Sequence, residues 1–151
     1  MEAPVAKKAA ANGEWLALGI SADENMGNDT VFECVFPSTD ASSVYLSHNT
    51  PTNNFRMLEA TSKLLYNTYT EKMEERLKCG ADWRLNLNGL SGQERSILLN
   101  LQTGVYRLMF ARGEIDQDGA KHSHDFDVLP RVSSSTLRFC ANCAEAAVVV
   151  A

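Results

Sequence analysis

The stretch Trp15-Leu-Ala-Leu-Gly-Ile-Ser21 decides the fold class, because it is short, apolar on both faces and followed by a polar loop. A second run, rich in β-branched and aromatic residues, covers Thr30 to Phe36. A shorter run covers Ser43 to Ser47, and a longer one covers Gly104 to Ala111. Turn-forming Gly, Pro, Asn and Asp residues separate these runs. Short strands at this spacing predict an all-β protein, and we expect an immunoglobulin-like antiparallel β-sandwich.

The middle of the chain is ambiguous, because residues 55–79 contain many good helix formers. The segment Asn67 to Thr70 argues against one continuous helix, so this part is predicted to be mostly β. Asp82 to Leu87 alternates apolar and polar residues and is predicted as a further strand. We expect six apolar side chains of these strands to be buried: Trp15, Val31, Val35, Leu85, Val105 and Leu108.

Length and charge narrow the classes of function. The chain has 151 residues, which fits one domain, and its net charge is −5 without a basic stripe. Nucleic acid and anionic membrane surfaces are therefore not expected as partners. No apolar run reaches about 18 residues and no signal peptide is recognisable, so the chain is either cytosolic or a piece of a longer secreted or membrane protein. We expect a disordered segment over 1–13, a domain over 14–139 and a tail over 140–151.

Several motifs together resemble the DOMON family. Its strand W-x-A-x-G-x-S, followed by D-x-x-M-G and another strand, is similar to Trp15–Ser21, Asp23–Gly27 and Val31–Val35. Tyr106–Gly113 is similar to the family's last long strand, and Gly119-Ala-Lys-His122 to its Lys/Arg-His step. The surroundings of the cysteines at positions 34 and 79 resemble the ferric-chelate reductase-like subgroup. The resemblance covers roughly residues 14–139.

Two features depart from the family pattern. Family domains usually have a strand before the W-x-A-x-G-x-S strand, whereas only about a dozen residues precede it here. The larger relatives continue into a membrane cytochrome b561 unit, which this sequence does not contain. We therefore expect a fragment or a short form, exposed on the extracellular or lumenal side of a membrane as part of a longer parent chain.

The resemblance implies a haem-binding function. The family's axial ligands match Met26 and His122, with His124 as a substitute if the loop register shifts. Methionine and histidine ligation raises the reduction potential of haem iron and leaves no position open for a substrate. The expected function is thus electron transfer by haem b, with a membrane cytochrome b561-type donor or acceptor. A c-type attachment is excluded, because the C-x-x-C pair Cys140/Cys143 is followed by Ala144.

Other interpretations stay open. Met26 and His122 could be ordinary loop residues, and the domain could be a non-haem DOMON module that binds a sugar or a protein. A hydrolase has little support, since no G-x-S-x-G motif occurs, and no stand-alone turnover of a small molecule is expected. Whether the domain forms part of a ferric reductase is left open.

Three further sequence features concern cysteine chemistry and glycosylation. Cys34 and Cys79 have counterparts in the resembling subgroup, which implies a disulfide if the chain folds outside the reducing cytosol. The C-x-x-C pair is half of a zinc site at best. Asn28-Asp29-Thr30 is an acceptor triplet for N-glycosylation, and a glycan there would crowd a haem edge next to Met26.

Overall fold

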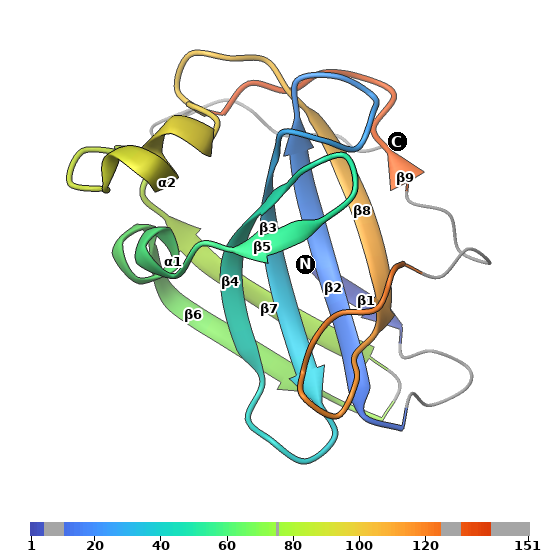
Figure 1. Ribbon diagram of the computed structural model, residues 1–151. Coiled ribbons are helices and arrows are strands. Elements are labelled where there is room, and N and C mark those ends of the chain that lie inside the picture. Colours follow the sequence, from blue (N-terminus) through green and yellow to red (C-terminus); the bar gives the residue numbers. More distant parts are fainter. Residues whose placement is uncertain (5–10, 75, 125–130, 140–151) are drawn as a thin grey trace.

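Two antiparallel β-sheets make up the protein in the computed structural model, which describes residues 1–4, 11–74, 76–124 and 131–139 (Figure 1). The three-stranded sheet has the order β1 (Glu2–Pro4), β7 (Arg76–Trp83), β6 (Leu65–Lys72). The six-stranded sheet has the order β5 (Asn54–Arg56), β4 (Ser43–Asn49), β3 (Asp29–Pro37), β2 (Gly13–Ser21), β8 (Arg107–Glu114), β9 (Arg131–Val132). Two short helices, α1 (Leu58–Leu64) and α2 (Gly92–Ile97), lie at one end. The expected all-β class is confirmed.

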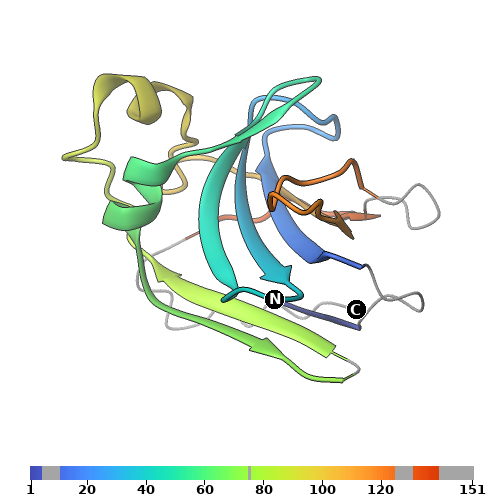
Figure 2. The same cartoon turned by 60° about the horizontal axis from the view of Figure 1, so that its bottom comes forward.

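The inner faces of the two sheets enclose the main core (Figure 2). Strands β2 and β3 contribute alternate residues to it, as the period of two along a strand requires. Cys34 of β3 and Cys79 of β7 form a disulfide across this core, with their Cα atoms 6.5 Å apart. The expected pairing is confirmed, and closing a loop of this length contributes about 3–4 kcal/mol in the chain-entropy model.

The outer face of the six-stranded sheet has its own small core. Trp15, Val31 and Val35 are buried there together with Ile115, which belongs to the segment after β8. This segment folds back over the sheet and pairs through the bridge between Ile115 and Lys121. The burial expected for the two valines and the tryptophan is confirmed, although they face away from the main core.

The N-terminus differs from the sequence prediction. Glu2–Pro4 form β1 rather than a disordered segment, and Ala3 is buried in the main core. The Met1 ammonium group donates a hydrogen bond of 2.7 Å to the carbonyl oxygen of Cys79. The prediction was wrong for these residues because their strand character comes from pairing with β7, not from their own composition. The predicted tail 140–151, with both cysteines of the C-x-x-C pair, lies outside the described residues.

Other element boundaries also differ. Residues 55–79 combine α1 with β6 and the first half of β7, so the mostly-β prediction holds only in part. The predicted strand from Asp82 ends at Trp83, and Leu85 is only half-buried. Val105 is 45% exposed, contrary to prediction, because the neighbouring Tyr106 points inward and donates its hydroxyl hydrogen to the carbonyl oxygen of Asn100. Leu108 is half-buried.

Candidate functional site

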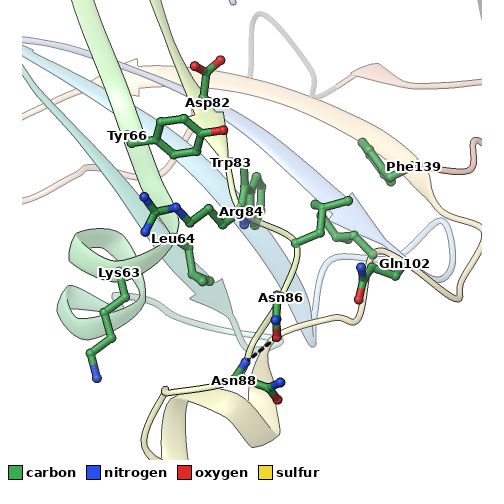
Figure 3. Close-up of a pocket in the computed structure, with 12 residues that line it drawn as sticks. Lys63, Leu64, Tyr66, Asp82, Trp83, Arg84, Asn86, Asn88, Gln102 and Phe139 are labelled. Atoms are coloured by element: carbon green, nitrogen blue, oxygen red, sulfur yellow. Dashed lines mark hydrogen bonds between the residues drawn. The ribbon is translucent and has the colours of Figure 1, made fainter. Parts of the chain in front are cut away.

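A pocket of about 780 Å³ opens at the end of the sandwich where α1 meets β6 and β7 (Figure 3). Its volume lies within the range typical of small-molecule sites. The walls come from the end of α1, the start of β6, the end of β7 with the loop after it, and two later segments of the chain. The lining residues are Lys63, Leu64, Tyr66, Asp82, Trp83, Arg84, Leu85, Asn86, Asn88, Leu101, Gln102 and Phe139.

Aromatic rings form the apolar part of this pocket. Trp83 is the last residue of β7 and is half-buried. It packs against the main core and against a second, small cluster formed by Ile20, Leu101 and Tyr106. Tyr66 is 42% exposed, and the Arg84 guanidinium group lies 5.0 Å from the centre of its ring. Phe139 reaches the pocket from the far end of the described chain (Figure 3). Aromatic faces of this kind offer stacking surfaces to the apolar face of a ligand.

Polar side chains surround these rings. The Asp82 carboxylate accepts a hydrogen bond of 2.7 Å from the Asn67 carboxamide. The Asn86 carboxamide oxygen accepts one of 2.9 Å from the backbone N–H of Asn88 (Figure 3). The Gln102 carboxamide makes no hydrogen bond within the described chain. Amides and carboxylates that retain free donor or acceptor positions can bind hydroxyl groups of a ligand.

A β-bulge places a second tyrosine on the same outer face as Tyr66. The register of β6 against β7 shifts between Tyr66 and Tyr69, where Asn67 has a φ of 49°. Tyr66 therefore stands opposite Asp82, and Tyr69 stands opposite Gly80. The Tyr69 ring lies across this glycine, since a Cβ atom there would come within 2.6 Å of it, and the ring is 47% exposed. The bulge thus extends the aromatic surface beyond the pocket.

Met26 lies in the loop that joins β2 to β3 and is 46% exposed. The next residue, Gly27, donates its backbone N–H to the buried Asp29 carboxylate at 2.9 Å. This loop projects from the Ser21 end of β2, at the top of Figure 1. The methionine therefore lies beyond the ends of two central strands, with nearly half of its surface exposed.

His122 lies near the other end of β2. Its backbone N–H donates to the Glu114 carbonyl oxygen at 2.9 Å, and its carbonyl oxygen accepts the Trp15 indole N–H at 3.1 Å. Trp15 and Ser21 are six residues apart in one strand, which corresponds to about 20 Å. Met26 continues beyond Ser21, so the structure does not bring Met26 and His122 together.

The described arrangement does not fit the expected haem site. One iron atom needs both axial donors within bonding distance, on opposite sides of a flat ring. His124 follows two residues after His122 in the same segment, and therefore does not remove the separation from Met26. No cluster of three or more His, Cys, Asp or Glu side chains suited to a metal ion occurs in the part of the chain that the structure describes.

Glu33 is the centre of a polar cluster that the sequence analysis did not identify. Its side chain is fully buried on the outer face of β3 and accepts hydrogen bonds of 2.8 Å from both the Arg56 Nε and the Ser47 hydroxyl. The Lys121 ammonium group also contacts this carboxylate. Burial lowers the pKa of Lys121, and the charge of Glu33 opposes that effect. The glutamate within the apolar run Val31–Val35 was the available sequence signal.

This cluster fastens the segment after β8 to the sheet. The Lys121 Nζ atom lies 5.5 Å from the centre of the Trp15 indole ring and bonds the Asn54 carboxamide oxygen at 2.5 Å. The Arg56 guanidinium group also donates to the Gly119 carbonyl oxygen at 3.4 Å. The charges of Glu33, Arg56 and Lys121 are therefore already paired within the chain, and the cluster is a satisfied structural feature.

Comparisons with known proteins add no relative. No protein-family model, no curated protein and no solved structure matches the chain. No helix within the described ranges is long and apolar enough to cross a membrane.

Proposed function

We propose that this chain is an immunoglobulin-like β-sandwich of the DOMON type that serves as a ligand-binding module, with a saccharide as its ligand. The observation that carries the proposal is the pocket in which the half-buried Trp83 and the exposed Tyr66 stand among amide and charged side chains. The sequence motifs support the family, and the two antiparallel sheets agree with it. The residues proposed to contact the ligand are Tyr66, Asp82, Trp83, Arg84, Asn86 and Gln102.

The chemistry of the pocket favours a saccharide over a purely apolar ligand. A sugar ring has an apolar C–H face that can stack on an aromatic ring, and a rim of hydroxyl groups that both donate and accept hydrogen bonds. Trp83 supplies the aromatic face, while Asn86 and Gln102 supply amide donors and acceptors. Lys63, Asp82 and Arg84 bring both signs of charge to the pocket, and Lys63 is already paired with Glu59, so the pocket has no strong preference for a charged ligand.

Electron transfer through a haem with Met26 and His122 as ligands stays a prediction. It is supported by the sequence motifs, whereas the separation of the two residues along β2 argues against it. An absorption spectrum of purified protein after addition of haem provides the test. A saturable Soret band that is lost in Met26→Ala and in His122→Ala would restore electron transfer as the leading function.

The proposed location is the extracellular or lumenal side of a membrane. The Cys34–Cys79 disulfide is compatible with it, because such bonds persist in oxidising compartments. A cytochrome b561-type membrane partner belongs to the electron-transfer function alone. The saccharide-binding function requires no such partner.

The test of saccharide binding is a screen of immobilised glycans, followed by calorimetry with any glycan that binds. Trp83→Ala is expected to weaken binding at least tenfold, because an aromatic side chain that the bound ligand covers contributes more than about 1.4 kcal/mol. Arg84→Ala should weaken it less, while the matched control Arg95→Ala, in α2 and outside the pocket, should not change it. Absence of binding to all glycans, or binding unaffected by Trp83→Ala, would overturn the proposal.

A further inference from the structure

We propose that Asn28 is an N-glycosylation site and that it is modified before the domain folds. Asn28-Asp29-Thr30 is the one Asn-x-Ser/Thr triplet, with x other than proline, in the whole sequence. The proposal concerns the loop between β2 and β3, which does not line the pocket. It is therefore independent of which ligand the pocket binds.

The folded domain has room for a glycan on Asn28. This residue is exposed at the end of the loop before β3, with a φ of 57°, a left-handed conformation that asparagine tolerates well. Within the described chain no hydrogen bond uses its carboxamide. The carboxamides of Asn49 and Asn54, in contrast, are bonded to each other at 2.8 Å. A sugar on the Asn28 nitrogen would therefore displace no contact of the fold.

The third residue of the triplet is in the opposite situation. Thr30 is fully buried, and its hydroxyl oxygen accepts a hydrogen bond of 2.9 Å from the backbone N–H of Leu99. Asp29 is also fully buried and pairs with Asn49 in the β-sheet. A transferase must reach the hydroxyl of the triplet together with its asparagine. The folded domain exposes only Asn28, so the triplet can be recognised only in the unfolded chain.

The order of events follows from these positions. Thr30 first serves in recognition by the transferase, and on folding its hydroxyl becomes the acceptor that holds residue 99. The oxidising compartment that permits the Cys34–Cys79 bond also contains the glycosylation machinery of eukaryotic cells. Modification would thus precede closure of the sandwich.

The reaction is a group transfer from a lipid-linked oligosaccharide diphosphate. The bond between the first sugar carbon and the diphosphate oxygen breaks, and a bond forms between that carbon and the Asn28 carboxamide nitrogen. The nitrogen loses one proton, and the lipid diphosphate leaves. No oxidant or reductant takes part, and Asn28 keeps its place in the loop.

The first experiment directs the chain into the secretory pathway of eukaryotic cells and treats the product with peptide N-glycosidase. The wild-type chain should show a band shift on denaturing gels that the enzyme removes. Asn28→Asp, which keeps a short polar side chain suited to positive φ, should abolish the shift, whereas Thr30→Ser should retain it at least in part. If the wild-type chain shows no band shift, or if the shift persists in Asn28→Asp, the assignment of Asn28 as a glycosylation site is overturned.

The second experiment tests the order. Unmodified, disulfide-bonded protein and the same protein after reduction and unfolding are each incubated with the purified transferase and its lipid-linked donor. We expect modification of the unfolded chain and at least tenfold less of the folded one. Equal modification of both overturns the proposed order. A short peptide containing residues 25–33 serves as the positive control for the transferase.

Discussion

The outer face around Glu33 and the pocket beside Trp83 differ in how completely their polar groups are paired. Glu33 receives hydrogen bonds from Arg56, Ser47 and Lys121 and has no exposed surface. In the pocket, the Trp83 ring is half-buried and the Tyr66 ring is exposed. The Gln102 carboxamide has no hydrogen-bond partner within the described chain. A satisfied buried network stabilises a fold, whereas unpaired polar groups beside exposed rings are available to a ligand. The difference separates a structural site from a candidate binding site.

Among the changes considered, replacement of Glu33 should destabilise the outer face of the six-stranded sheet most strongly. Glu33→Gln removes the negative charge that two buried or half-buried cations share, so the free energy of unfolding should fall by about 3 kcal/mol or more. Denaturant unfolding measures the change. The control Glu24→Gln removes an exposed partner of Arg107 and should cost less than about 1 kcal/mol. Equal effects of the two variants would contradict the structural role of Glu33.

The disulfide joins the strand that carries Glu33 to the strand that ends at Trp83. Reduction, or Cys34→Ser with Cys79→Ser, should lower the free energy of unfolding by about 3–4 kcal/mol in the chain-entropy model. Because both regions depend on this link, saccharide binding should weaken as well. Thermal unfolding with and without reductant measures the first effect. An unchanged melting temperature would show that the cross-link contributes little.

Acid should destabilise the domain through His48. Burial lowers the pKa of this histidine, while the Asp29 charge opposes the shift. The folded state therefore holds His48 neutral, whereas the unfolded chain takes up its proton near pH 6.5. The free energy of unfolding should decline as the pH falls below about 6.5. His48→Gln should flatten this decline between pH 7 and pH 5.5, and an identical pH profile in the variant would refute the assignment.

The smallest expected effect concerns a single polar contact of the pocket. Gln102→Ala should weaken saccharide binding two- to tenfold, as expected for loss of one neutral hydrogen bond of about 0.5–1.5 kcal/mol. Stability should be unchanged. The matched control Gln93→Ala, exposed in α2 and outside the pocket, should leave binding as it is. If both glutamine variants bind equally well, the ligand does not contact this wall.

Local patterns were sufficient for the central strands. The apolar run Trp15–Ser21 and the β-branched and aromatic run Thr30–Phe36 predicted β2 and β3 nearly to their ends. The patterns failed where pairing or packing overrides local preference. β1 exists through its pairing with β7, and the inward position of Tyr106 leaves Val105 exposed.

The sequence by itself determined the all-β class, and the motifs in it implied the Cys34–Cys79 pair. Only the tertiary structure decided the candidate sites. Trp83 and Phe139 meet in one pocket although they lie 56 residues apart in the chain, and Lys121 reaches Glu33 across a separation of 88 residues. The tertiary structure also decides that Met26 and His122 lie near opposite ends of β2. Strand periodicity is a local property, whereas the position of a loop depends on the sheet to which it is attached.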